Sequence, residues 1–161
     1  MIIAYDLELE KTVQEVGGWG NAIAGQAGIS CAVAQDPFSW KSWIFLKDNL
    51  SYLGTVLNHA DLVCTWNGDR FDDKILKNLN YDAHRAPRFD LLKAAWKHGG
   101  RSKGWTLAET VQRNLPAKKL KHGYEAPLLF QQGELGKLLT YACRDVWLLC
   151  FLVNKVLKEG Y

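Results

Sequence analysis

Three groups of acidic residues, far apart in the chain, carry the chemistry that this sequence could perform. The first group is Asp6 and Glu8, within the apolar stretch "IIAYDLELEK" at 2–11. Strand side chains alternate between two faces, so Asp6 and Glu8 would lie side by side on the face that also carries Ile2 and Ala4. Two carboxylates this close in a poorly solvated place repel each other. Either one of them is protonated or a cation lies between them.

The second group follows a later apolar stretch, in "TWNGDRFDDKIL" at 65–76. Asp69, Asp72 and Asp73 come directly after a predicted strand, and ligands of α/β proteins bind where strands end. Asp72 or Asp73 could equally cap the N-terminus of the following helix. This loop is therefore a candidate cation site with a structural alternative.

The third group is Tyr141 and Asp145, in "YACRDVWLLC" at 141–150. Residues four apart share one face of a helix, so the two side chains would lie together. An aspartate on a largely apolar helix is costly unless it has a partner, and the adjacent Arg144 would face elsewhere. Asp145 is thus either part of a structural salt bridge or a ligand.

Together the three groups supply four carboxylates: Asp6, Glu8, one aspartate of the second group and Asp145. Such hard oxygen ligands suit Mg²⁺ or Mn²⁺ better than zinc. Two such ions can activate a water and stabilise the leaving oxygen in phosphodiester cleavage. A metal ion would then be the cation between Asp6 and Glu8.

Positive charge is concentrated in one part of the chain, at 91–122. This segment holds eight lysines and arginines and one acid, Glu109, whereas the whole chain has a net charge of +3. The remainder is therefore net acidic. Basic residues interleaved with Trp96, Trp105 and Tyr124 are typical of phosphate-backbone binding with base stacking, although a solvated surface explains them equally well.

The elements that would position these residues alternate between strands and helices. "GGWGNAIAG" at 17–25 is interpreted as a turn, and 123–134 as a connection whose Glu125 faces solvent. Mixed strands and helices of this order predict an α/β fold with a central mixed β-sheet flanked by helices, in one domain at 1–161. We expect strands at 2–9, 29–35, 42–46 and 61–66, and helices at 49–59, 72–79, 90–98, from the capping box Thr106–Glu109 to Pro116, and at 134–159 up to Gly160.

Composition bounds the class of protein. No segment reaches the ~20 uninterrupted apolar residues of a membrane span, and the N-terminus lacks a signal-peptide pattern, so we expect a cytoplasmic protein that does not contact a membrane. The four cysteines show no zinc-ligand spacing, which predicts buried, reduced thiols at Cys31, Cys64, Cys143 and Cys150.

Three motifs in order give the chain a family resemblance. Asp6-Leu7-Glu8 matches an Asp-x-Glu motif, Asn67 to Asp72 matches Asn-x-x-x-Phe-Asp, and Tyr141 to Asp145 matches Tyr-x-x-x-Asp. The chain resembles the DnaQ-like 3′-to-5′ exonucleases of the ribonuclease H-like fold, in the DEDDy subgroup named for four acids and a tyrosine. It looks most like the small stand-alone members of bacterial and phage origin.

The resemblance implies a role for each matching residue. Asp6, Glu8 and Asp145 would hold the ion that activates the attacking water, and Asp6 with Asp72 a second Mg²⁺ or Mn²⁺. Tyr141 would orient that water. The substrate-binding residues would be Leu7 and Phe71 near the terminal nucleotide, a supporting Asn67, and the basic Lys118, Lys119 and Lys121.

The implied activity is removal of nucleoside monophosphates from the 3′ end of a nucleic acid, which we expect to be DNA rather than RNA. The enzyme would work with replication or repair proteins, in a bacterial or phage-infected cell. Two positions leave details open: Leu9 stands where the family often has a small polar residue, and Asp69 and Asp73 rival Asp72. The alternatives are a structure-selective endonuclease or junction resolvase on the same fold, and a catalytically silent nucleic-acid-binding module.

Overall fold

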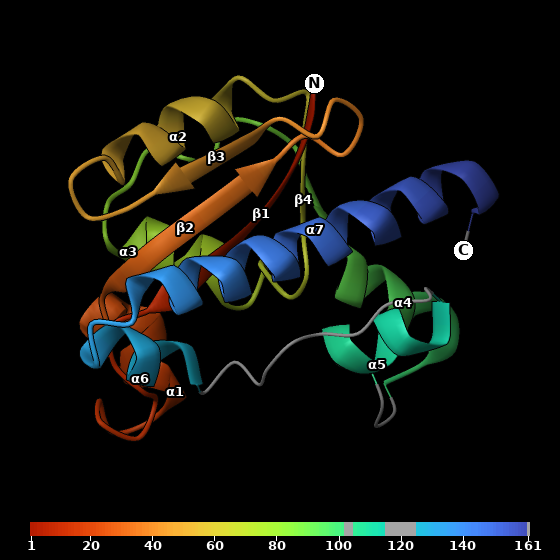
Figure 1. Ribbon diagram of the computed structural model, residues 1–161. Coiled ribbons are helices and arrows are strands. Elements are labelled where there is room, and N and C mark those ends of the chain that lie inside the picture. Colours follow the sequence, from red (N-terminus) through yellow and green to blue (C-terminus); the bar gives the residue numbers. More distant parts are fainter. Residues whose placement is uncertain (102–104, 115–124, 161) are drawn as a thin grey trace.

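A five-stranded mixed sheet forms the centre of the computed structural model, which describes residues 1–101, 105–114 and 125–160 (Figure 1). The strand order is β3-β2-β1-β4-β5. The pairs β1·β2 and β2·β3 are antiparallel, whereas β1·β4 and β4·β5 are parallel. This confirms the expected α/β class and places the first strand at the centre. The strands are β1 Ile2–Leu9, β2 Ile29–Gln35, β3 Ser42–Phe45, β4 Leu62–Thr65 and β5 Arg88–Asp90.

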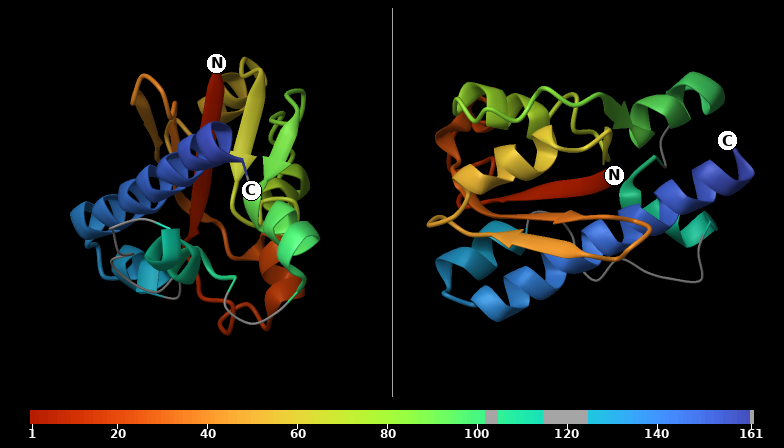
Figure 2. Two further views of the ribbon diagram at one scale, coloured as in Figure 1. Left: turned by 90° about the vertical axis from the view of Figure 1, so that its right-hand side faces the viewer. Right: turned by 90° about the horizontal axis from the view of Figure 1, so that it is seen from above.

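Helices cover both faces of the sheet, as the view from above in Figure 2 shows. Side chains of β1 alternate: Ile3, Tyr5 and Leu7 pack with α2 (Ser51–Asn58) and α3 (Asp72–Asn78). Ala4 belongs to the opposite core, with the long helix α7 (Leu135–Glu159). Asp6 and Glu8 share the face of Ala4 by the period of two. The first acidic pair is thus on the side of α7.

Most expected elements are present within a residue or two of their predicted bounds. Helix α4 spans Leu91–Gly99 and α5 spans Leu107–Asn114. The capping box at the start of α5 is confirmed: the Thr106 hydroxyl donates to the Glu109 carboxylate at 2.6 Å, and the Glu109 N–H donates to the Thr106 hydroxyl at 3.1 Å. Helix α7 ends at Gly160, whose φ of +77° favours glycine. Pro116 lies outside the described residues.

Three segments differ from expectation. The stretch interpreted as a turn contains the short helix α1 (Trp19–Asn21) and a π-helical turn, η1 (Ala22–Gln26). The segment interpreted as a connection contains α6 (Glu125–Gln131), whose Pro127 lies in the first turn, where proline needs no hydrogen-bond donor. Strand β5 has only three residues, too few for an alternating pattern to appear in the sequence.

The cysteines and the helix lengths agree with the compositional argument. All four cysteines are free, and Cys31, Cys64 and Cys150 are buried, whereas Cys143 is half-buried. Burial raises the pKa of the Cys64 thiol to about 12, so it stays protonated at neutral pH. Among the described residues, no helix combines the length and apolarity that crossing a bilayer requires.

Candidate active site

The carboxylates of β1 and α7 converge at one point. Asp6, Glu8 and Asp145 each place a carboxylate oxygen within 4.8 Å of the other two. Glu8 and Asp145 are buried, and Asp6 is half-buried. The convergence follows from the fold, because α7 lies over the face of β1 that carries the even-numbered side chains. It confirms the expectation that the first and third acidic groups meet.

These three side chains fit a divalent cation. Magnesium binds oxygen ligands at 2.0–2.1 Å, so two oxygens on opposite sides of one ion lie about 4 Å apart. Oxygens within 4.8 Å of one another need little movement to share an ion. The donors are all carboxylates, which suit hard cations such as Mg²⁺ and Mn²⁺. The cluster therefore could hold a metal ion.

Asp72 is the acid of the second group that faces this cluster. It is the first residue of α3, it is 3% exposed, and its Oδ1 accepts a hydrogen bond from the Leu7 N–H at 3.3 Å. Burial, followed by the charges of Asp6 and Asp73, raises its pKa well above the usual range of a carboxyl. The negative charges of Asp72 and Asp6 thus repel each other across the space between β1 and α3.

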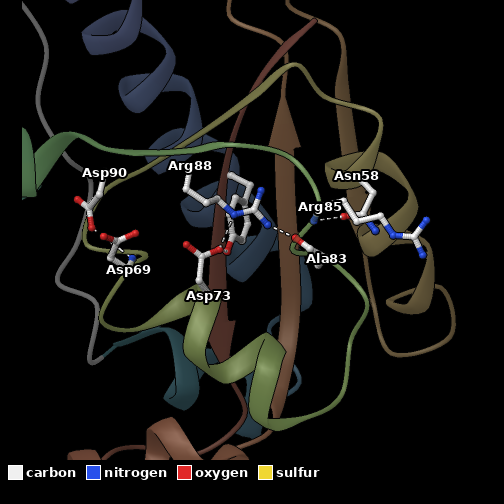
Figure 3. A network of polar contacts seen from close by, with 8 residues as sticks. Asn58, Asp69, Asp73, Ala83, Arg85, Arg88 and Asp90 are labelled. Carbon is white, nitrogen blue, oxygen red and sulfur yellow. Dashed lines mark hydrogen bonds and ion pairs between the residues drawn. The ribbon is translucent and has the colours of Figure 1, made fainter.

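The rival aspartates have other partners (Figure 3). Asp73 accepts hydrogen bonds through Oδ1 from the Tyr5 hydroxyl at 2.6 Å and from Nε of Arg88 at 3.0 Å. Arg88 also donates through Nη2 to the carbonyl oxygen of Ala83. Asp69 forms an ion pair with Lys93 at 2.7 Å. Neither Asp72 nor Asp73 is the N-cap of α3, which is Phe71. The geometry therefore favours Asp72 over its two neighbours as a ligand.

Tyr141 lies beside the carboxylates, one helical turn before Asp145. Its side chain is 3% exposed. Burial raises the pKa of its hydroxyl far above the usual value, and the charges of Glu8, Asp145 and Asp6 raise it further. The hydroxyl therefore remains protonated and can donate a hydrogen bond throughout the physiological pH range.

A cavity of about 550 Å³ opens over the acidic cluster. Of the predicted site residues, Asp6, Glu8, Asp72 and Tyr141 line it, and so do the expected substrate-binding residues Leu7, Asn67 and Phe71. Lys118, Lys119 and Lys121 lie outside the described residues. Residues from three distant parts of the chain, all assigned to the site from the sequence, thus line one continuous cavity.

Trp19 also lines this cavity, and the sequence analysis missed it. Its side chain is 64% exposed and meets the Phe71 ring edge-on, with centroids 5.5 Å apart and an interplanar angle of 75°. The surrounding glycines indicated a turn, so the helical segment α1, which places the Trp19 ring in the lining of the cavity, was not expected. A tryptophan between glycines in a polar segment was the one available signal.

Asp90 is a second residue that sequence reasoning missed, and it fixes the loop between β4 and α3. Its Oδ1 accepts from the N–H groups of Asn67 at 3.0 Å and Lys93 at 3.2 Å, and its Oδ2 from the Asp69 N–H at 3.2 Å. One buried carboxylate thus caps α4 and also holds the loop that leads to Asp72.

The loop itself is tight. Asn67 has a φ of +70°, in the left-handed region, and its carbonyl oxygen accepts from the Phe71 N–H at 3.1 Å. A Cβ at Gly68 would lie 2.5 Å from Oγ1 of Thr65, so only glycine fits there. These constraints fix the direction in which the chain enters α3.

Comparison with known proteins gives a structural match without a sequence match. No protein-family model matches the chain, and no curated protein sequence matches it. The fold is similar to that of a family B DNA polymerase from the hyperthermophilic archaeon Pyrobaculum calidifontis, with a TM-score of 0.72 and 14% identity. The match covers 97% of this chain but 24% of the polymerase chain, so the protein spans about a quarter of its neighbour's length. At this identity the similarity shows the fold alone, a mixed five-stranded sheet flanked by helices, which is consistent with the expected ribonuclease H-like fold.

Divalent cations should stabilise the protein through the acidic cluster. A ligand present at one hundred times its Kd stabilises the folded state by about 2.7 kcal/mol. For a chain of this size that raises Tm by roughly 5–10 °C. Asp145→Asn removes one converging charge, so it should raise Tm in EDTA and reduce the shift caused by Mg²⁺ or Mn²⁺. Thermal unfolding followed by circular dichroism measures both effects, with the exposed Asp48→Asn as the control. Equal metal-induced shifts of Tm in the unchanged protein, Asp145→Asn and Asp48→Asn would contradict the assignment of Asp145 as a metal ligand.

Removing the Asp90 carboxylate should unfold the loop locally and weaken the fold. Asp90→Ala leaves three backbone N–H groups without their acceptor, and a buried unsatisfied donor costs about 1–3 kcal/mol. We expect the free energy of unfolding in urea to fall by at least about 2 kcal/mol, and by less in Asp90→Asn, which keeps one acceptor oxygen. Asp36→Ala, which removes a similar acceptor from the distant β2–β3 hairpin, is the comparison. An unchanged midpoint of urea unfolding in Asp90→Ala would show that water replaces the carboxylate as the acceptor of these N–H groups.

Proposed function

We propose that the protein is a DnaQ-like, metal-dependent 3′-to-5′ exonuclease that removes nucleoside monophosphates from the 3′ end of a nucleic acid, which we expect to be DNA rather than RNA. One observation carries the proposal: Asp6, Glu8 and Asp145 converge within 4.8 Å of one another, and Asp6 and Glu8 line a cavity together with Asp72 and Tyr141. These are the residues at which the three motifs resemble that family. The structural neighbour is a DNA polymerase, which supports a nucleic-acid substrate.

Asp6, Glu8 and Asp145 would hold one Mg²⁺ or Mn²⁺, and Asp72 together with Asp6 a second. Ions at such a site generate a nucleophile at neutral pH and neutralise charge on the attacked phosphate. The protein's part is to keep four carboxylates together in a partly buried place. The sheet and the two flanking helices do this, and Asp6 and Glu8 are fixed relative to each other because both lie on β1.

Tyr141 would position the attacking water. Its hydroxyl is held protonated by burial and by three neighbouring carboxylates, so it donates a hydrogen bond and does not act as a base. A positioned donor restricts the orientations of the water before attack, and this lowers the activation barrier of the reaction.

The shape of the cavity supports action at a chain end. A volume of about 550 Å³ lies in the range of sites that enclose a single small ligand, and a terminal nucleotide is of that size. The lining includes the apolar side chains of Leu7, Phe71 and Trp19, which would contact the base, and acidic side chains, whose bound ions would contact the phosphate. Asn67 supports the lining at the end of β4.

A gel assay tests the proposed function directly. A 5′-labelled oligonucleotide, single-stranded and duplex, is incubated with Mg²⁺, Mn²⁺ or EDTA. We expect a metal-dependent ladder that shortens from the 3′ end, and a loss of at least about 100-fold in rate in Asp6→Asn and Asp145→Asn, since each removes a carboxylate ligand. Asp48→Asn serves as the control. Discrete internal cuts would indicate an endonuclease, and intact substrate under every condition would indicate a binding module.

Tyr141→Phe separates positioning from metal binding. We expect kcat to fall by about 10- to 100-fold, since a positioned hydrogen bond to the reacting group is lost. The Tm shift caused by Mg²⁺ should remain that of the unchanged protein, because the carboxylates are all retained. Single-turnover rates and thermal unfolding measure the two effects. A Tyr141→Phe protein with normal kcat would exclude the proposed role of the hydroxyl.

A further inference from the structure

A basic and aromatic surface lies on α4, next to the loop between β4 and α3. We call it the Trp96 surface, and it comprises Arg70, Lys93, Trp96, Lys97 and Arg101. All but Arg70 line a hollow of about 470 Å³ that also includes Asp69, Arg88 and Asp90. It is separate from the cavity over the acidic cluster, and nothing in the proposed chemistry uses it.

Trp96 holds two arginines from different segments side by side. The guanidinium carbon of Arg70 lies 4.9 Å from the centroid of the Trp96 ring, and that of Arg101 lies 5.1 Å from it. Two guanidinium groups repel each other, whereas the ring attracts both. The aromatic side chain therefore keeps two positive charges close together in the absence of any ligand.

The two acids near this surface already have partners other than Arg70, Lys97 and Arg101. Asp69 pairs with Lys93, and the Asp90 carboxylate accepts three backbone N–H groups. Within the part of the chain that the structure describes, no carboxylate lies at ion-pair distance from Arg70, Lys97 or Arg101. Among the described residues, no carboxylate therefore neutralises these three cations.

The Trp96 surface and the acidic cavity lie on two sides of one short loop. Asn67 lines the acidic cavity, and Asp69, two residues later, lines the hollow on α4. The parallel strands β4 and β5 end at the same edge of the sheet, and Asp90 bonds the two ends together. A chain whose end lies in the acidic cavity can thus continue across residues 67–70 onto α4.

We propose that the Trp96 surface binds the phosphate backbone of the nucleic-acid strand whose end occupies the acidic cavity. This inference rests on the proposed function for the direction of the strand. Guanidinium groups match phosphate oxygens with two parallel hydrogen bonds, and arginines held in place lose less freedom on binding. Arg70 lies nearest the loop in sequence, and Arg101 follows the end of α4, so the two arginines reach the strand from two segments.

The salt dependence of binding tests this surface. The affinity for a labelled single strand of 12 nucleotides is measured by fluorescence anisotropy in EDTA, where cleavage cannot occur, over a series of salt concentrations. Each phosphate contact contributes about −0.7 to the slope of log K against log [salt] for a single strand. Arg70→Gln, Lys97→Gln and Arg101→Gln should each make the slope shallower by about 0.7 and weaken binding about fivefold at 0.1 M salt.

Lys41→Gln is the matched control. Lys41 also lies over a tryptophan ring, with its Nζ 5.0 Å from the centroid of Trp43, but it directly precedes β3, the edge strand at the opposite side of the sheet from β5. It should change neither the slope nor the affinity. Trp96→Leu tests the aromatic support separately: it keeps every charge, so we expect weaker binding with an almost unchanged slope, and recovery in Trp96→Phe.

The outcomes separate this inference from the proposed function. If the protein degrades DNA with Mg²⁺ but the three variants behave like Lys41→Gln, the Trp96 surface is not a strand-binding site and the exonuclease proposal stands. Slopes that become shallower in the three variants, in a protein without nuclease activity, support the surface and overturn the exonuclease. Absence of binding to any oligonucleotide would overturn the inference. Binding of an acidic protein at Trp96 in place of the strand would do so too.

Discussion

The packing of α7 across the central strand is the contact on which the whole site depends. It brings Asp145 onto Asp6 and Glu8, although like charges 4 Å apart repel by about 4 kcal/mol at an effective dielectric constant of 20. Apolar burial on both sides of the charges opposes this repulsion. Ala142, Val146 and Leu149 are buried in the same core as Ala4 and Cys31, and each buried aliphatic side chain contributes about 1.5–3 kcal/mol. Apolar packing therefore holds α7 in place without a cation, and the three carboxylates stay close enough together to bind one.

Adjacent aspartates at the start of α3 show how the sheet separates chemistry from support. Asp72 faces the acidic cluster, while the next residue of α3, Asp73, accepts hydrogen bonds from Tyr5 and Arg88. Tyr5 and Asp6 are likewise adjacent on β1 and point to opposite faces. Two successive residue pairs thus divide in the same way: one member belongs to the site and the other joins β1, α3 and β5 beneath it.

The sequence predicted the features that depend on short-range periodicity. Alternation on the first strand put Asp6 and Glu8 on one face, and a spacing of four joined Tyr141 to Asp145. Motif register with Phe71 selected Asp72 from three aspartates. What it missed depends on tertiary contacts. The π-helical turn η1, which directly follows the helix that carries Trp19, packs against α3, where Nδ2 of Asn78 donates to the carbonyl oxygen of Ile23 at 2.8 Å. Strand β5 is recognisable only through its pairing with β4.

Asp90 has consequences beyond the loop that it holds. Because one carboxylate accepts from Asn67, Asp69 and Lys93, the loop to Asp72 and the first turn of α4 cannot move independently. A phosphate bound by the arginines at Trp96 would pull on α4, and Asp90 would pass that displacement to Asn67, which lines the acidic cavity. The same bonds also work in reverse, since a ligand that orders the loop also orders α4. Strand binding at the proposed surface would therefore be linked to the position of Asp72 through Asp90, a residue to which we assign no chemical step.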